Sequence, residues 1–310
     1  MARPRKPDES IRVKVDGHEV VTYSYGRGDE VLFLLNGGPG LPCNYLRDPL
    51  IPLAEAGYRV VTYDQLGTGA SDRPSNPKLW TIRRYAREVE TVRRALNVPA
   101  VHLLGQSWGG WLAIEYTLTY PRSVRTLLLS NTCGDMPHLV SELDRLRAAL
   151  GPETVAMMQR HEAEGTYDHP EYRAAITLLN YRHVHRLDVI PPSLKASLDH
   201  WNMALYMTMQ GPNEFHYIGN LKDWNRIPDM GRIRQPALIL VGYFDEIGPA
   251  CALRMHDALP DSRVVLFKNS SHLPMHEEPG RYLAEVKGFL DAHRSHDAKV
   301  KARHAKARAR

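Results

Sequence analysis

Short apolar runs recur along the first part of the chain and again near its end, and most of them lead into a polar or glycine-rich loop. The runs at 31–35, 101–104 and 237–241 contain no Asp, Glu, Lys or Arg, a pattern typical of strands that are covered on both faces of a sheet. Segments with apolar residues at helical spacing separate the runs. This alternation predicts an α/β fold, in which helices cover both faces of a mostly parallel sheet.

Residues that commonly begin or end helices and turns define the expected secondary-structure elements. A helix is expected from residue 82 with Thr81 as its N-cap, and another from Trp108 to Tyr120. Asp16-Gly17 is a hairpin signal between two short strands. Further helices are expected after Pro249 and at 279–293. The expected strands are 11–15, 20–25, 31–35, 59–63, 101–104, 124–129, 237–241 and 263–267.

The pattern changes in the middle of the chain. Residues 134–228 carry long helical periods, as at 139–150 and 172–187, and no strand of the earlier kind. We therefore expect an α/β core in two parts with a helical insertion between them rather than a separately folding domain. The expected boundaries are 1–133 for the first part, 134–228 for the insertion, 229–293 for the second part and 294–310 for a basic tail.

Charge and cysteine content narrow the class of protein. The formal net charge is +5, but residues 294–310 alone carry +6, so the rest of the chain is close to neutral at −1. The tail is expected to be a disordered, solvated end, and nucleic-acid binding is not expected because aromatic residues do not interleave its basic residues. The three cysteines lie far apart and lack metal-ligand spacing. With no apolar stretch long enough for a secretory signal or a membrane span, we expect a cytoplasmic protein.

The most informative motif is Gly-Gln-Ser-Trp-Gly-Gly at 105–110, directly after the expected strand 101–104. Its glycines permit a sharp strand-to-helix turn that exposes the hydroxyl of Ser107, which is the geometry of a nucleophile elbow. A plain glycine-rich turn is the alternative. The position between a strand and a helix favours the nucleophile.

A serine nucleophile needs a base and a carboxylate that orients the base. Two later strand ends offer them, because 237–241 leads into Asp245 and 263–267 leads into His272. The chain order Ser107, Asp245, His272 is that of the α/β-hydrolases. We therefore expect Ser107 as nucleophile, His272 as general base and later acid, and Asp245 as its orienting partner. A turn aspartate and a solvated loop histidine are the alternatives.

The same chemistry requires backbone donors for the oxyanion of the tetrahedral intermediate. We expect one from the N–H of Trp108, which follows the nucleophile, and one from Gly38 in the loop Asn36-Gly37-Gly38-Pro39-Gly40. The alternative for this loop is a turn that only redirects the chain.

Several motifs together resemble those of the proline iminopeptidase family of α/β-hydrolases, with closest similarity to the tricorn-interacting aminopeptidase branch. The resemblance covers roughly residues 11–293. It rests on the following motifs: Gly-Gly-Pro-Gly at 37–40, the loop 64–71, Gly-Gln-Ser-Trp-Gly-Gly at 105–110, Gly-Pro-Asn-Glu-Phe at 211–215, Lys-Asp-Trp at 222–224, Gly-x-x-Asp-Glu at 242–246 and Ser-His at 271–272. It implies an α/β-hydrolase fold with a helical cap, here 134–228. It also implies release of an N-terminal residue, preferably proline, from short peptides without a metal or other cofactor.

The resemblance also implies that Glu214 and Glu246 bind the free α-amine of the substrate, with Tyr206 as a wall of the pocket. Paired carboxylates suit this task because they accept charge-assisted hydrogen bonds from a cation. Because Glu246 adjoins Asp245, we expect Asp245 to face His272 while Glu246 faces the substrate. The alternatives are a surface acid for Glu214, a helix-start acid for Glu246 and a core aromatic for Tyr206. One departure is Asn36, where the family usually has histidine; an asparagine amide is also able to brace this loop through backbone hydrogen bonds.

Three activities share these residues. The first is a serine aminopeptidase acting on short peptides, the second an amino-acid amidase such as a prolinamide hydrolase, and the third another acyl-bond hydrolase with the same triad. A binding module without catalysis is the non-enzymatic alternative. The sequence favours the aminopeptidase and leaves the oligomeric state open.

Overall fold

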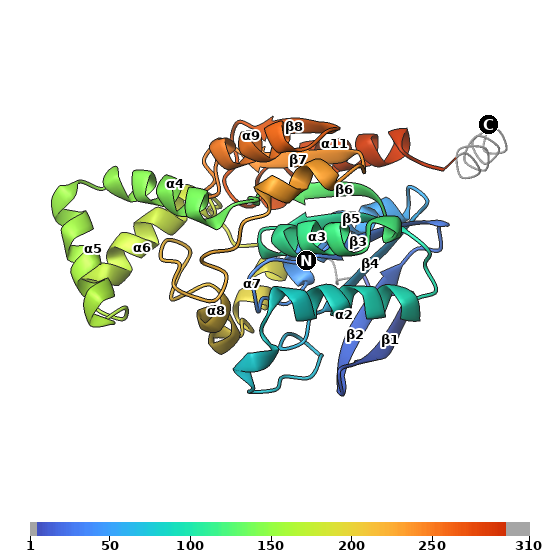
Figure 1. Ribbon diagram of the computed structural model, residues 1–310, viewed down its shortest axis with the longest axis horizontal. Helices are drawn as coiled ribbons and strands as arrows, with labels where there is room; N and C mark the ends of the chain where they lie inside the picture. The colour runs from blue at the N-terminus through green and yellow to red at the C-terminus, as the bar shows by residue number, and fades with distance from the viewer. Residues whose placement is uncertain (1–4, 296–310) are drawn as a thin grey trace.

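The computed structural model describes residues 5–295, and an eight-stranded sheet forms its centre (Figure 1). The strand order is β1-β2-β4-β3-β5-β6-β7-β8. The pairs β1/β2 and β2/β4 are antiparallel, and every other pair is parallel, as expected from the alternation of strands and helices. The strands are β1 Glu9–Val15, β2 His18–Tyr25, β3 Glu30–Leu35, β4 Tyr58–Asp64, β5 Val101–Gln106, β6 Val124–Ser130, β7 Ala237–Gly242 and β8 Ser262–Phe267.

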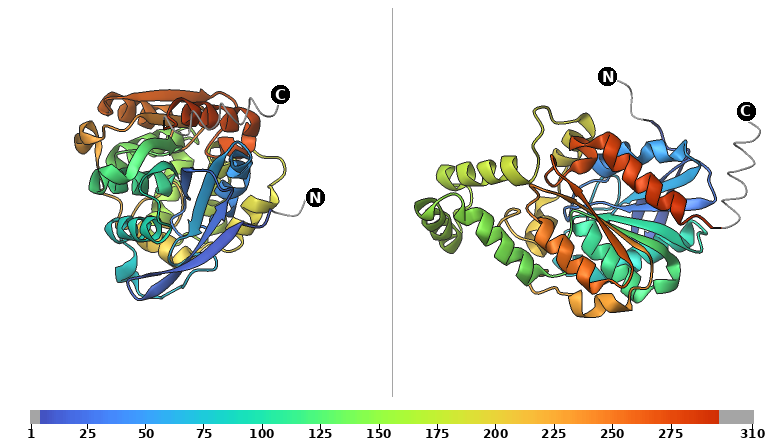
Figure 2. Two further views of the ribbon diagram at one scale, coloured as in Figure 1. Left: turned by 90° about the vertical axis from the view of Figure 1, so that its right-hand side faces the viewer. Right: turned by 90° about the horizontal axis from the view of Figure 1, so that it is seen from above.

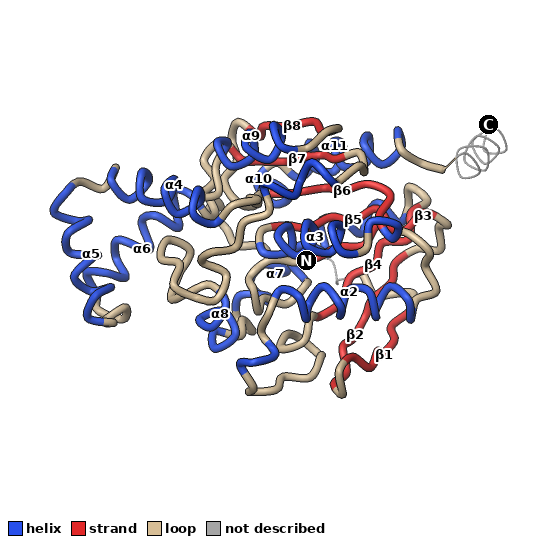
Figure 3. Tube along the Cα trace, viewed as in Figure 1, coloured by secondary structure: helices blue, strands red, loops and turns tan. Residues whose placement is uncertain are grey.

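Helices cover both faces of the sheet, which Figure 2 shows from above and Figure 3 by secondary structure. Thr81 caps the second helix, since its side chain accepts a hydrogen bond from the N–H of Arg84. The helices are α1 Asn44–Leu50, α2 Ile82–Ala95, α3 Trp108–Thr119, α4 Met136–Ala148, α5 Pro152–Glu164, α6 Pro170–His183, α7 Pro192–Leu198, α8 Met203–Met209, α9 Pro249–Ala258, α10 Pro274–Glu277 and α11 Pro279–Ala292.

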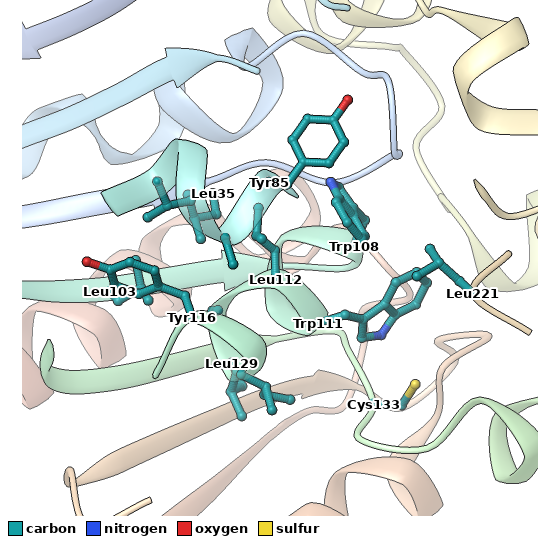
Figure 4. Close-up of a cluster of buried hydrophobic side chains, with 14 of the residues drawn as sticks. Leu35, Tyr85, Leu103, Trp108, Trp111, Leu112, Tyr116, Leu129, Cys133 and Leu221 are labelled. Atoms are coloured by element: carbon teal, nitrogen blue, oxygen red, sulfur yellow. The ribbon is translucent and has the colours of Figure 1, made fainter. Parts of the chain in front are cut away.

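The alternation of side chains along each strand divides the core into two layers. On β3, Phe33 and Leu35 pack with α2, α3 and α9, whereas Leu32 and Leu34 pack with α1 and α11. Figure 4 shows the first layer around α3, where Trp108 and Trp111 meet in an edge-to-face contact at 6.2 Å between ring centroids. The apolar runs in the sequence are therefore strands buried on both faces.

Helices α4–α8 occupy the chain between β6 and β7, and α4, α5 and α6 extend beyond one end of the sheet (Figure 1). The helical period at 139–150 corresponds to α4, which begins earlier, at Met136. The period at 172–187 corresponds to α6, which already ends at His183. Helices α5, α7 and α8 are too short or too weakly patterned to be separated in the sequence.

Other expectations concern the ends of the chain and its cysteines. Within residues 5–295, no helix is long and apolar enough to cross a membrane. The three cysteines are free and buried. Nearly all of the basic tail at 294–310 lies outside the described residues, so its predicted disorder stays a prediction.

Helix α3 lies so close to the sheet that only glycine fits at its start. A Cβ on Gly109 would lie 2.0 Å from the carbonyl oxygen of Leu35, and one on Gly105 would lie 2.1 Å from the carbonyl oxygen of Gly109. Both neighbours are backbone atoms that have no rotamer by which to move away. The glycines around Ser107 thus hold the strand-to-helix turn against the sheet.

We predict that Gly109→Ala destabilises the protein by about 3 kcal/mol or more, because the added methyl group overlaps the backbone of β3. Gly288→Ala is the matched control. Gly288 is exposed in the interior of α11 with nothing within 4 Å of an added Cβ, so alanine should stabilise by about 0.5–1 kcal/mol. Urea unfolding measures both changes, and equal stability of the two variants would contradict this account.

Candidate active site

Ser107 lies at the turn between β5 and α3, in a backbone conformation that few non-glycine residues adopt. Its φ is 56° and its ψ is −126°. The turn is held on both sides, since the N–H of Ser107 donates to the carbonyl of Ser130 at 3.0 Å and the carbonyl of Ser107 accepts from Thr132 Oγ1 at 2.9 Å. Such over-determined strain is characteristic of functional positions. The side chain lines a cavity of about 420 Å³.

His272 lines the same cavity, and its ring is fixed from behind by Asp245. His272 Nδ1 lies 2.8 Å from Asp245 Oδ1. The carboxylate is itself held by the N–H of Ile247 at 3.0 Å and by Asn131 Nδ2 at 2.8 Å. Because Asp245 accepts at Nδ1, the Nδ1–H tautomer is favoured, and Nε2 is left as the ring's basic nitrogen.

Glu246 differs from the expectation that Asp245 faces the histidine while Glu246 faces the substrate. Both carboxyl groups face His272, since Glu246 Oε1 lies 3.2 Å from Nδ1. Glu246 is 1% exposed and neither of its oxygens has a hydrogen-bond partner among the described residues. Burial, reinforced by the adjacent Asp245 carboxylate, raises the pKa of Glu246 well above its usual value.

Glu214 enters the cavity from the loop after α8. Gln210 Nε2 donates to Glu214 Oε2 at 2.6 Å and lies 2.7 Å from the hydroxyl of Tyr206, so the three side chains form one unit. Tyr206 lines the cavity beside Glu214 and stacks edge-to-face on Trp201 at 4.6 Å. Burial raises the pKa of Glu214 as well. The structure thus brings an acid from the inserted helices to the same cavity as Ser107.

The expected oxyanion donors are available. Within the described chain, neither the N–H of Gly38 nor that of Trp108 donates a hydrogen bond to another protein group. Gly38 lines the cavity with φ of 111°, a conformation that favours glycine. Asn36 braces this loop, because its Nδ2 donates to the carbonyl of Leu41 at 2.5 Å. The neighbouring Gly37 N–H donates to Tyr45 Oη at 2.6 Å.

The end of α6 and the residues directly after it contact both loops that carry Asp245 and His272. The N–H of Glu246 donates to the carbonyl of His183 at 3.3 Å, and the N–H of Arg186 donates to Glu277 Oε1 at 2.6 Å. Glu277 also accepts from the N–H of Ser271 at 2.5 Å, directly before His272. The inserted helices and the histidine loop are therefore mechanically connected.

The charges around His272 set its proton affinity. Burial by itself favours the neutral imidazole, but the carboxylates of Asp245, Glu214 and Glu277 hold the pKa of His272 above its usual value. The side chains of Asp245 and His272 are less than a tenth exposed, so water screens these interactions poorly.

Two groups within residues 5–295 have the composition of a metal site. Asp245, Glu246 and His272 form one, but Nδ1 of the histidine already pairs with Asp245. His161, His169 and Glu171 form the other on α5 and the start of α6. There the two imidazoles are stacked at 4.3 Å with an interplanar angle of 21°, so their lone pairs do not converge on one point.

Sequence reasoning missed the residues that support this site. Asn131 follows β6 and Glu277 ends α10, and neither belongs to a motif used in the sequence analysis. Gln106, which donates to the carbonyl of His272 at 3.2 Å, lies inside the Gly-x-Ser motif, where the pattern treats it only as a spacer. The signal for Asn131 is its place at the end of a buried strand beside the strand that carries Ser107.

Replacing Glu277 by glutamine should lower the pKa of His272, because it removes a nearby negative charge and one acceptor for the N–H of Ser271. Glu278→Gln is the matched control. Glu278 holds the same loop through Ser270 Oγ at 2.6 Å and Asn269 N at 3.2 Å, but it does not contact Ser271. NMR titration of His272 measures the pKa, and an equal shift in both variants would refute a specific role for Glu277.

Comparisons with known proteins agree with this geometry. The α/β-hydrolase fold family matches residues 30–279. A proline iminopeptidase of Saccharolobus solfataricus is 37% identical over 262 residues, which cover 84% of each chain. The crystal structure of VinJ has a TM-score of 0.88 at 33% identity and covers 93% of this chain and 100% of VinJ. The crystal structure of the Mycobacterium smegmatis proline iminopeptidase has a TM-score of 0.84 at 34% identity, over 92% of this chain and 98% of that one.

These matches span most of both partners, and the chain is a serine hydrolase that belongs to the proline iminopeptidase family of α/β-hydrolases.

Proposed function

We propose that this protein is a serine aminopeptidase that releases an N-terminal residue, preferably proline, from short peptides through an acyl-enzyme. The observation that carries the proposal is the pairing of a strained serine and a buried His272–Asp245 pair with an acid, Glu214, in one cavity. An acid in this cavity suits a substrate that carries a positive charge near the scissile carbonyl. The names of the related proteins, which are proline iminopeptidases, support the same activity.

In the proposed mechanism, Ser107 Oγ attacks the carbonyl carbon of the first residue while His272 Nε2 takes the hydroxyl proton. The N–H groups of Trp108 and Gly38 stabilise the oxyanion. His272 then protonates the departing nitrogen, the C–N bond breaks, and the acyl group stays on Ser107. Water, deprotonated by His272, attacks the ester, and the proton returns to Ser107 as the amino acid leaves. Asp245 keeps the imidazole oriented throughout.

Glu214 and Glu246 are proposed to bind the protonated amine of the substrate, which is a secondary ammonium group in proline, with Tyr206 beside them. Glu214 reaches the cavity directly, whereas Glu246 lies behind His272, and a cation bound nearby would favour the ionised form of its carboxyl group. A bound cation offsets the repulsion among these carboxyl groups, while a substrate without the amine leaves them unpaired. Helices α4–α8 are proposed to act as a cap, because α6, α7 and α8 each contribute residues to the cavity.

Ser107→Ala should lower kcat for proline 4-nitroanilide at least about 10⁴-fold, since the acyl-enzyme cannot form. A fluorophosphonate probe should label the wild-type protein at Ser107 and leave the variant unlabelled. Labelling at another residue, or activity in the variant close to that of the wild type, would contradict the assignment. Circular dichroism establishes that the variant is folded.

Glu214→Gln should reduce kcat/KM for proline 4-nitroanilide by about 10²-fold or more, because a charge-assisted contact to the amine is lost. N-acetylation of the substrate should abolish turnover by the wild type. The control is Glu142→Gln on α4, which does not line the cavity and whose carboxylate pairs with Arg145. Equal rates with blocked and free substrates would refute amine recognition.

The pH profile of kcat/KM should be bell-shaped. On the acid side the rate falls as His272 becomes protonated, and because the pKa of His272 is raised, this limb lies above the usual histidine range. On the alkaline side the rate falls as the substrate amine loses its proton. Steady-state kinetics across both limbs test this, and a profile that is flat over the acid limb would contradict the role of His272.

A further inference from the structure

The stretch 176–198, which runs from α6 through α7, forms one wall of the cavity on the side of the histidine loop. The carboxylate of Glu277 accepts hydrogen bonds from the N–H groups of both Arg186 and Ser271, so this wall and His272 are held next to each other. The carbonyl of His183 also accepts from the N–H of Glu246. The wall is therefore fixed to both loops of the His272–Asp245 pair.

The chemistry of the reaction determines what this wall would contact. His272 protonates the departing nitrogen, so the leaving group must lie on the histidine side of Ser107. Glu214, which is proposed to bind the amine, comes from the loop after α8 and is not part of this wall. It follows that the part of the peptide after the first residue lies against 176–198.

The side chains of this wall that line the cavity are apolar or neutral. Asn180 and His185 are its polar members, and burial lowers the pKa of His185, which keeps that ring neutral. Asn180 Oδ1 and His185 Nδ1 have no hydrogen-bond partner among the described residues. The apolar members are Ile176, Val184, Leu194 and Leu198.

Positive charge is missing from this cavity. None of the described residues that line it is lysine or arginine, and its acidic member is Glu214. A carboxylate placed here would lose water without gaining a cationic partner, and the carboxyl groups near His272 would repel it. An apolar side chain would instead bury its surface against Ile176, Val184 and Leu198.

We propose that residues 176–198 form a leaving-group subsite that selects peptides with an uncharged, apolar second residue and disfavours a carboxylate at that position. The carboxylate is either the side chain of an acidic second residue or the free C-terminus of a dipeptide. The inference rests on the proposed aminopeptidase function and specifies its substrate class. It also separates peptides from prolinamide, whose leaving group is too small to contact this wall.

The first test compares kcat/KM for Pro-Leu-NH₂, Pro-Asp-NH₂, the free dipeptide Pro-Leu and prolinamide. Pro-Leu-NH₂ should exceed each of the other three at least ten-fold. A rate for Pro-Asp-NH₂ or for prolinamide equal to that for Pro-Leu-NH₂ would overturn the subsite. Proline 4-nitroanilide is measured alongside, because its turnover supports the proposed function even if the subsite fails, and its resistance would refute the function itself.

The second test places a cation in the wall. Val184→Lys should lower the preference for Pro-Leu-NH₂ over Pro-Asp-NH₂ at least five-fold, by giving the carboxylate a partner. Val189→Lys is the matched control, since Val189 is 79% exposed, follows in the same linker and does not line the cavity. Ile176→Lys, within α6, is the second variant if Val184→Lys does not fold. An unchanged preference in a folded wall variant, or an equal change in Val189→Lys, would refute the placement.

Discussion

The crowding of carboxyl groups around one buried histidine is the constraint on which the rest of this site depends. Asp245 and Glu246 both approach Nδ1 of His272, and Glu214 adds a third carboxyl group at the cavity. Burial makes this costly, and the raised pKa values of Glu214 and Glu246 are its direct consequence. A cation that enters the cavity relieves the repulsion. The same charges that make His272 more basic thus also favour a substrate with a free amine.

The fold holds these carboxyl groups and His272 in place through many local contacts. Parallel strands end at one edge of the sheet, which is why the turn after β5 and the loops after β7 and β8 meet there. Close backbone contacts fix Ser107, and Asn131 and Glu277 fix the two loops of the His272–Asp245 pair. Part of this bracing comes from the inserted helices through Arg186. The cavity wall and the reacting groups are therefore one connected structure.

The sheet and the proposed reacting groups could be predicted from the sequence, because both depend on patterns among residues that are close together in the chain. Buried strands show as continuous apolar runs, and Asp245 and His272 stand where such runs end. The supporting groups follow no such rule. Glu277 matters through contacts to Ser271 and Arg186 that only the tertiary structure creates. For the same reason, adjacency in sequence suggests that Asp245 and Glu246 face apart, whereas both turn toward His272.

The most direct measurement is a crystal structure of Ser107→Ala with Pro-Leu-NH₂ bound. We expect the proline nitrogen within hydrogen-bond distance of Glu214. We also expect the scissile carbonyl oxygen at the N–H groups of Trp108 and Gly38, and the leucine side chain against 176–198. A peptide bound with its imino nitrogen away from Glu214 and toward solvent would contradict the central claim that the buried acids select the amine.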